Sequence, residues 1–539
     1  MIKSDILFFR RAGRKLFFSP QARVAFFSAL LFGLFSHGMG LFNKLSHQDD
    51  IANLFGFGAT ITSGRWMLHL FAWMEGLLFG TGNASLPLYN GLLSIFCVGV
   101  SCALLVHLLR IRNPVYCALL SCLMVAFPVM TALFSYMFTS HPYMLGFLMM
   151  VLSGCLICRG TSWRIRLFAV LLGGASVGVY QAFLPVLLAI LLIDDILTLK
   201  KEESAGTFLR RAGIQALCLA GILLVYFAAN RFFLYRFHLT LTSYQGIDRM
   251  GMMSVPTFLK RVGTAYRVFF FPPRNVAEDM YPGTLFYLYV LMLAANGLLA
   301  LLRVIRLGKE NRINAVFLGI LYALVPLGCQ FIYVMSEDVH GLMVFGQAMQ
   351  FALLIAQLAE WETRSDPAAG LKRNGLPLIR KKTGNGRAFP GKQVVSLTAS
   401  VLLAAACIMY ARFDNQCYLK DTLQQQEATS YYTTVITQIK SQEGYTPDTK
   451  ICFVNDWSEF DPTIYNLPEM DFIRLNLYGR DTTNYIHIAK EFFMRVWCGF
   501  EANWYWGEDP AGWPEVQAMP EYPADGSIQM IRDVLIVKF

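Results

Sequence analysis

Long runs of apolar residues are the feature that most restricts how this 539-residue chain can fold. Runs of about eighteen or more such residues are long enough to cross the hydrocarbon core of a bilayer as helices. The composition agrees, because apolar residues make up 55% of the chain and charged residues only 15%, against about 25% charged in an average soluble domain. We therefore predict an α-helical polytopic membrane protein.

The apolar runs predict eleven membrane spans, and one pair of them is open to a second interpretation. The spans are expected at 24–44, 88–109, 115–134, 143–158, 167–180, 182–199, 212–234, 284–302, 313–335, 342–359 and 393–411. Residues 167–199 can instead form one kinked span and a re-entrant segment that pivots near Tyr180 and Pro185. That alternative would reverse the orientation of every later span.

The distribution of charge predicts the orientation in the membrane. Residues 1–23 contain six Lys and Arg residues, and alternate loops between the expected spans are also basic. Cytoplasmic loops carry such an excess. The whole chain has a formal charge of +10, but residues 413–539 hold 19 Asp and Glu against 9 Lys and Arg. We expect a plasma-membrane protein with a cytoplasmic N-terminus and an extracytoplasmic C-terminus. The topology accounts for the basic charge, which is no indication of nucleic-acid binding.

The sequence divides into three regions: a basic cytoplasmic N-terminus (1–23), a transmembrane domain (24–411) and an extracytoplasmic C-terminal domain (412–539). Helical character over 419–442 and two strand-like segments, "KICFVND" and "IQMIRDVLIVKF", predict a small α+β fold for the C-terminal domain. The sequence allows one disulfide in this domain, with Cys452 and Cys498 as the first candidates, but does not assign it.

Two external loops, 45–87 and 235–283, carry the residues best suited to catalysis. In the first loop, Asp49 and Asp50 directly follow a span, and a carboxylate close to the membrane costs enough free energy that it usually has a use. A carboxylate can take the proton from a sugar hydroxyl, and two adjacent ones can hold a divalent cation such as Mg²⁺ or Mn²⁺. The plainer alternative is that one of them caps a helix over 51–57.

Arginines in the same loops can bind phosphate, because the planar guanidinium matches two phosphate oxygens at once. The candidate phosphate-binding residues are Arg65, Arg261, Arg267 and Arg274. The last three can equally neutralise lipid head groups. The segment 64–79 has the pattern of an amphipathic helix that lies in the membrane interface.

The chain resembles the type II glucosyltransferases of bacteriophage serotype conversion and their wider bacterial family. The resemblance rests on Asp49-Asp50, Gly64-Arg65-Trp66 and Tyr180-Gln181. It is clearest over residues 24–200, and His47-Gln48 departs from the family pattern. The resemblance implies the fold of the GT-C class of polytopic glycosyltransferases, a polyprenyl-phosphate sugar as donor and a cell-envelope glycan as acceptor.

The resemblance also implies a mechanism. One aspartate, Asp50 or Asp49 with a slight preference for Asp50, would deprotonate the acceptor hydroxyl in a single displacement that inverts the anomeric carbon. The family suggests glucose as the sugar. The candidate residues for contact with sugar or acceptor are His141, Tyr180, Gln181 and Trp66. A metal cofactor is expected only if the Asp-Asp pair holds Mg²⁺ or Mn²⁺.

Other activities compete with this hypothesis. A lipid-linked sugar transporter or flippase would be expected to place ionisable residues near the middle of its spans and to show paired repeats, whereas the middles of these spans are nearly free of charge and we find no repeat. A polysaccharide polymerase or ligase shares the architecture but relies more on external arginines and histidines. A binding scaffold would leave the Asp-Asp pair unexplained. The sequence therefore favours a membrane glycosyltransferase.

Overall fold

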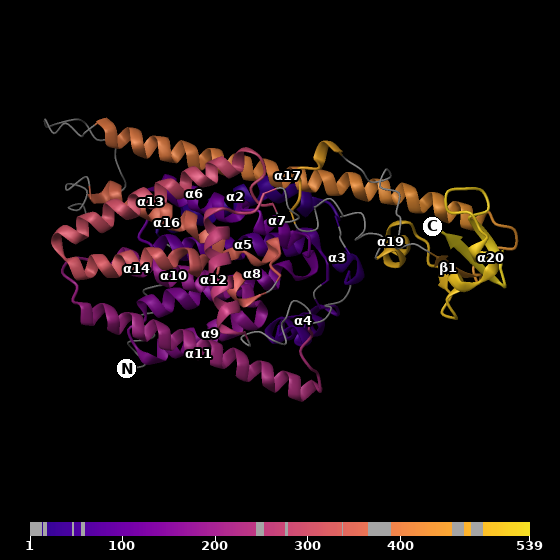
Figure 1. Cartoon of the computed structure of the whole chain (residues 1–539), viewed down its shortest axis with the longest axis horizontal. Helices are drawn as coiled ribbons and strands as arrows, with labels where there is room; N and C mark the ends of the chain where they lie inside the picture. The colour runs from indigo at the N-terminus through magenta and orange to yellow at the C-terminus, as the bar shows by residue number, and fades with distance from the viewer. Residues whose placement is uncertain are drawn as a thin grey trace.

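The chain forms a bundle of long helices with a small sheet domain beyond one end, as the computed structural model shows (Figure 1). The structure describes residues 13, 19–45, 48–54, 60–82, 84–243, 253–274, 279–336, 338–364, 390–454, 468–475 and 489–539. Predictions about His47, about most of the basic N-terminus and about most of the basic loop 360–392 lie outside the described residues.

Eight helices in the described part of the chain are long and apolar enough to cross a membrane. They are α2 (Pro20–Phe42), α5 (Pro87–Leu108), α8 (Met137–Arg159), η2 (Gln181–Phe183) with α10 (Leu184–Thr198), α11 (Ala205–Phe237), α13 (Thr284–Glu310), α14 (Arg312–Cys329) and α17 (Pro390–Lys440). The other three predicted spans correspond to α6 (Pro114–Ala126) with α7 (Val129–Phe134), to α9 (Trp163–Val179), and to α16 (Met349–Arg364) with the preceding η4 (Gly341–Met343) and η5 (Phe345–Ala348). All eleven predicted spans therefore coincide with helical segments, while the number of membrane crossings stays a prediction. Shorter helices between the spans are α3 (Gln48–Ala52), η1 (Ile61–Ser63), α4 (Trp66–Phe79), α12 (Val255–Phe270) and α15 (Ile332–Met335).

The predicted span 115–134 is broken in the middle by a proline. A residue that precedes proline is pushed out of the helical region by the proline ring, and Phe127 accordingly has φ −65° and ψ 136° before Pro128. Phe127 is fully buried and packs against Phe351 and Tyr410. The break therefore places an aromatic side chain in the core of the bundle.

Residues 167–199 form two separate helices, so the kinked alternative is not observed. Helix α9 ends at Val179, Tyr180 is extended, and α10 begins at Leu184. Arg159 at the end of α8 donates two hydrogen bonds to Asp194 near the end of α10, at 2.9 and 2.6 Å. Since α9 starts directly after α8, the start of α9 and the end of α10 lie at the same end of the bundle, and the two helices are antiparallel.

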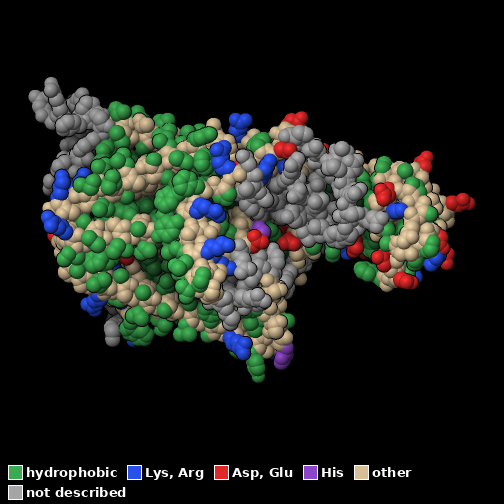
Figure 2. All heavy atoms as spheres, in the orientation of Figure 1, with side chains coloured by type: hydrophobic (Ala, Val, Ile, Leu, Met, Phe, Trp, Pro, Cys, Tyr) green, Lys and Arg blue, Asp and Glu red, His purple; other side chains and the backbone are tan. Residues whose placement is uncertain are grey.

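The loops predicted to be cytoplasmic meet at one end of the bundle. Arg159 also donates to the carbonyl of Leu108, at the end of α5, at 3.1 Å. Arg303 of α13 donates to the carbonyl of Ile196 at 2.7 Å. Figure 2 shows Lys and Arg side chains at this end, where α13 meets α14, whereas Asp and Glu side chains gather on the C-terminal domain. We call this region the basic end.

Helix α17 connects the membrane helices to the C-terminal domain. It has 51 residues, which corresponds to about 75 Å at 1.5 Å per residue, and it continues without a break across residues 411 and 412. Figure 1 shows it running along the bundle and on to the sheet domain. The predicted helix over 419–442 is therefore the last part of this longer helix.

The C-terminal domain contains a four-stranded mixed sheet. The strands β1 (Lys450–Val454), β2 (Asn503–Trp504), β3 (Ile528–Ile531) and β4 (Val534–Lys538) lie in the order β2-β1-β4-β3. β1 is parallel to β2 and β4, and β3 pairs antiparallel with β4. The short helices α19 (Lys490–Trp497), η9 (Pro510–Gly512) and α20 (Pro514–Gln517) belong to the same region, whereas η7 (Pro468–Met470) packs on the core of the helix bundle.

Both strand predictions for this domain are confirmed. The hairpin between β3 and β4 turns at Arg532 and Asp533, whose φ values of 49° and 62° match the two positive φ angles of a tight hairpin turn. Cys452 and Cys498 are both free thiols, so the disulfide that the sequence left open does not form.

Candidate active site

The first turns of α8 organise the candidate site. Tyr136, the residue before α8, offers no side-chain cap, although the first backbone N–H groups of a helix need hydrogen-bond acceptors from elsewhere. Asp50 of α3 supplies one, because its carboxylate accepts a hydrogen bond from the backbone N–H of Phe138 at 3.0 Å. Asp50 is therefore a helix cap, as the plainer sequence interpretation proposed, but it caps α8 and not a helix of its own segment.

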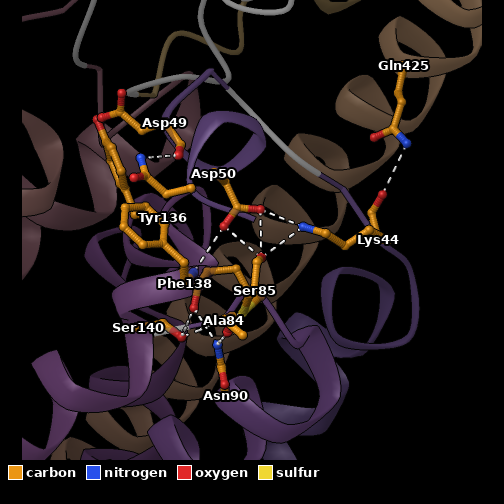
Figure 3. Close-up of polar contacts among 12 residues, drawn as sticks. Lys44, Asp49, Asp50, Ala84, Ser85, Asn90, Tyr136, Phe138, Ser140 and Gln425 are labelled. Atoms are coloured by element: carbon orange, nitrogen blue, oxygen red, sulfur yellow. Dashed lines mark hydrogen bonds and ion pairs between the residues drawn. The ribbon is translucent and has the colours of Figure 1, made fainter. Parts of the chain in front are cut away.

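The carboxylate of Asp50 is fully engaged inside the protein (Figure 3). Only 1% of the residue is exposed. Lys44 forms an ion pair with it at 2.6 Å, and the Ser85 hydroxyl lies 2.7 and 2.8 Å from its two oxygens. Gln425 of α17 donates to the carbonyl of Lys44 at 3.1 Å, so the longest helix also contributes to this cluster. The cluster fixes α3 against α8.

Asp49 differs from its neighbour in every one of these respects. Its side chain is exposed, and in Figure 3 its carboxylate points away from that of Asp50. Its backbone carbonyl accepts hydrogen bonds from the backbone and the side chain of Asn53, at 3.0 and 2.8 Å. Partial desolvation by the surrounding protein raises the pKa of Asp49. The positive charge of Arg65 opposes this rise, and the negative charge of Asp50 adds to it. Asp49 is therefore a carboxylate that reaches solvent and has an arginine close by.

The Gly64-Arg65 motif depends on a left-handed glycine. Gly64 ends η1 with φ 71°, where its N–H bonds to the carbonyl of Ile61, and residues with a Cβ adopt such a φ only at a cost. A Cβ at Gly64 would also lie 2.6 Å from the Tyr226 hydroxyl and 2.8 Å from Nε2 of Gln181. That amide donates to the carbonyl of Ser63 at 2.9 Å and lies 3.0 Å from the Tyr226 hydroxyl. Gln181 therefore holds the turn that presents Arg65.

Aromatic rings hold Arg65 itself. Its guanidinium carbon lies 5.0 Å from the ring centre of Tyr180 and 5.9 Å from that of Tyr143. The two tyrosine rings stack on each other, with centres 4.7 Å apart. Guanidinium groups stack favourably on aromatic rings, which keep the charge in place without neutralising it.

Trp66 anchors the other side of the same turn. Its ring stacks on Phe233 with centres 5.6 Å apart, and a Cβ at Gly178 would come within 2.4 Å of it. Trp66, Tyr180 and Gln181 are only 7%, 4% and 6% exposed. The side chains of these three predicted sugar-contacting residues are therefore buried inside the protein, where they pack around Arg65.

His141, the remaining predicted sugar residue, forms an ion pair with Glu75 of α4. The ring of Tyr89 lies edge-on to the imidazole, with centres 6.0 Å apart. Nδ1 of His141 is buried and has no hydrogen-bond partner among the described residues. His141 follows Phe138 by about one turn of α8, so the pair lies one helical turn from the Asp50 cap.

The other predicted arginines lie on different elements. Arg261 donates to the carbonyl of Val334, within α15, at 3.3 Å. Arg267, on α12, is exposed. Arg274 lies over the ring of Phe286, 4.4 Å from its centre. Helix α12 packs on α14 and α15. Tyr244, Asp248 and Arg249 of the same loop lie outside the described residues.

The sequence analysis missed the residues that complete the cluster. Lys44 offered a signal, because it ends the first span six residues before Asp50, but a lysine in that place is typical of ordinary membrane anchoring. Ser85 and Glu75 offered no sequence signal, because each contacts a partner that is distant in the sequence, Asp50 and His141 respectively. Asp421 of α17, 2% exposed, lies close enough to interact electrostatically with Lys44 and Asp50.

The Asp-Asp pair does not fit a resident divalent cation. A cation of this kind needs several oxygen ligands that converge on one point. Both oxygens of Asp50 instead accept hydrogen bonds from Lys44, Ser85 and Phe138, and Asp49 points elsewhere. Within the described residues, no group of three or more His, Cys, Asp or Glu residues is placed to share a metal ion.

A family model with the description "Glucosyl transferase GtrII" matches residues 38–351, which is more than half of the chain. The match includes Asp49, Arg65 and His141, and it ends before α17. No curated protein and no solved structure matches the chain.

Proposed function

The chain belongs to the glucosyl transferase GtrII family, and from this premise we propose that it moves glucose from a polyprenyl-phosphate donor to a cell-envelope glycan on the outer face of the cell membrane. One observation carries the assignment of the site: of two adjacent aspartates, Asp50 is buried in an ion pair, while Asp49 is exposed with Arg65 close by. A buried and satisfied carboxylate stabilises the fold, and an exposed one with a raised pKa can accept a proton.

In this proposal Asp49 is the general base. It takes the proton of an acceptor hydroxyl while that oxygen forms a bond to the anomeric carbon of the sugar. The bond between the anomeric carbon and the phosphate oxygen breaks in the same step, and its electron pair leaves with the polyprenyl phosphate. The single displacement inverts the anomeric carbon, and no sugar becomes attached to the protein.

Arg65 stabilises the leaving phosphate. The guanidinium is held by Tyr143 and Tyr180 and lies close enough to Asp49 to oppose the rise of its pKa, so little ordering is needed when a phosphate arrives. Preorganised charge of this kind stabilises a transition state in which negative charge develops. Arg261, Arg267 and Arg274 of the α12 region remain candidates for holding the donor as it approaches, and His141, oriented by Glu75, for holding the sugar or acceptor.

The topology belongs to the same proposal. The basic end lies at one end of the bundle, and α3, α4 and the C-terminal domain lie toward the other (Figures 1 and 2). The excess of Lys and Arg supports a cytoplasmic location for the basic end. The active site and the acidic C-terminal domain would then face outward.

The test is transfer of labelled glucose from polyprenyl-phosphate glucose to envelope glycan by the purified protein. We expect transfer with inverted configuration, read by NMR of the product linkage. Asp49→Asn should reduce the rate by about 10²–10⁴-fold, as expected for loss of a general base. Glu508→Gln removes another exposed carboxylate, in the C-terminal domain, and should transfer normally. Retained configuration, or full activity of Asp49→Asn, would refute the mechanism; transfer from a nucleotide sugar alone would refute the donor.

A further inference from the structure

The basic end contains cavities that the proposed glucosyl transfer does not use. One, of about 250 Å³, lies between the loop after α10 and the end of α13. It is lined by Leu199, Lys200, Lys201, Glu202, Arg303, Arg306, Leu307 and Glu310. Four of these eight residues are cationic and two are acidic. The cavity therefore favours an anion.

The cations of this cavity differ in how well they are neutralised. Arg303 forms an ion pair with Glu360 of α16. Lys201 lies 3.9 Å from Glu310, at a distance typical of a weak exposed pair. Lys200 and Arg306 form no ion pair with any carboxylate of the described residues. These two side chains supply the uncompensated charge.

The backbone around Lys200 is held firmly. The side-chain amide of Asn314, which is 1% exposed, donates to the carbonyls of Lys200 and Glu203, both at 2.8 Å. Asn311 donates to the carbonyl of Lys201 at 3.1 Å. The loop is thus attached to the start of α14, and Lys200 lines the cavity from a fixed position.

An adjoining cavity has an apolar side. It is lined by Leu299, Leu302, Arg303, Arg306, Gln357, Glu360 and Trp361, so Arg303 and Arg306 border both cavities. Leu302 is 48% exposed, and Leu298, Leu301 and Ile305 of the same helix are also exposed. This surface is the one that would face lipid chains. The path from Leu302 to Arg306 therefore leads from the apolar surface into the basic cavity.

A third cavity, of about 220 Å³, lies on the other side of Lys200 and adds further donors. Arg110, Arg112 and Thr198 contribute to its lining. The Thr198 hydroxyl oxygen is buried and has no hydrogen-bond partner among the described residues. A buried hydroxyl without a partner costs free energy, and a ligand oxygen in this cavity would satisfy it.

We propose that the basic end binds the phosphate head group of an anionic phospholipid, with the phosphate between Lys200 and Arg306 and an acyl chain along Leu299 and Leu302. The inference depends on the cations of the cavity and on the apolar side chains of α13 beside it, and it is independent of the transferase activity. Basic pockets between membrane helices are suited to such head groups. A soluble phosphate ester also carries the negative charge, but it has no acyl chain that could lie along Leu299 and Leu302.

The experiment uses the full-length protein purified in a neutral detergent. Its melting temperature is measured with added phosphatidylglycerol, with phosphatidylcholine, and with soluble glycerol 3-phosphate. Retained lipid is counted in parallel by native mass spectrometry. The test variant is Lys200→Gln/Arg306→Gln. The control is Lys309→Gln/Arg312→Gln, which removes the same charge from exposed residues at the same end that line none of the three cavities.

Phosphatidylglycerol should stabilise the wild type and the control variant alike, and the apparent affinity of the test variant should fall by about thirtyfold, as expected for loss of two cations near a phosphate. All three proteins should melt at the same temperature before lipid is added. The proposal is overturned if phosphatidylcholine stabilises equally, if the control loses as much affinity as the test variant, or if soluble glycerol 3-phosphate stabilises as well as the lipid. It is also overturned if the wild type retains no anionic lipid.

Discussion

Replacement of Asp50 by asparagine should damage stability, whereas the same change at Asp49 should damage chemistry. The new amide oxygen could still accept hydrogen bonds from Ser85 and from the N–H of Phe138, but Lys44 would lose the carboxylate that lies 2.6 Å from its ammonium group. Removal of one member of a buried ion pair costs about 3–5 kcal/mol. The Lys44 side chain is 29% exposed, so solvent recovers part of this, and we expect a loss of about 2–3 kcal/mol.

The assay is the thermal unfolding of purified protein together with the specific transfer rate of the folded fraction. Asp50→Asn should have a melting temperature several degrees below that of the wild type. Asp49→Asn should have the same melting temperature as the wild type, while its transfer rate falls by about a thousandfold. In Lys44→Met/Asp50→Asn the ammonium charge is gone as well, so part of the lost stability should return. The gain is limited because the buried Asp421 then loses the nearby charge of Lys44. The reasoning is refuted if Asp50→Asn melts normally and is inactive, while Asp49→Asn retains activity.

Three further predictions follow from the same geometry. Gly64→Ala should lower stability by about 2 kcal/mol, because alanine is strained at the positive φ and crowds Tyr226 and Gln181; melting within about 1 °C of the wild type, the shift that a few tenths of a kcal/mol would cause, would contradict this. The transfer rate should fall as pH drops through the pKa of Asp49, since the base must be deprotonated, and this acid limb should lie above that of an ordinary aspartate because the pKa is raised. In Arg65→Gln the limb should move to still higher pH, because the charge that lowers the pKa of Asp49 is lost, and an unmoved limb would place Asp49 outside the rate-determining proton transfer. Transfer should persist after dialysis against EDTA, and a loss that Mg²⁺ or Mn²⁺ restores would show that a cation takes part.

The spans and the motifs could be predicted because their signals are local. An apolar run identifies a helix without reference to the rest of the chain, and the glycine and arginine of Gly64-Arg65 are adjacent. The break at Phe127 was equally local, since it depends on Pro128, but the long apolar run concealed it. The continuity of α17 was missed for the opposite reason: the loss of apolar character after residue 411 was interpreted as an end of the helix, although a helix that leaves the membrane needs no apolar residues.

The roles of Tyr180, Gln181 and Trp66 could not be predicted in the same way. The sequence predicted that they contact sugar or acceptor, and the structure places them around the turn that carries Arg65. Whether an aromatic or amide side chain faces a substrate or supports its neighbour depends on Phe233, Gly178, Tyr226 and Ser63, which come from other helices and turns. Such long-range packing leaves no pattern in the local sequence.

The choice between Asp49 and Asp50 shows the limit of a motif most clearly. Successive residues of an α-helix project about 100° apart, so two adjacent aspartates on α3 cannot both face the same space. On α3, Asp50 turns toward the protein and Asp49 toward solvent, whereas the adjacent Asp194 and Asp195 of α10 are both buried and paired with arginines. An inward carboxylate is tolerated only where donors surround it. Ser85 and the N–H of Phe138 come from segments 35 and 88 residues away from Asp50. The two carboxylates of α3 therefore differ because only that of Asp50 reaches these donors. The expectation for this chain is that Asp50→Glu, which keeps the charge but lengthens the side chain, lowers the melting temperature of the purified protein more than Asp49→Glu does, because only the first change disturbs the start of α8.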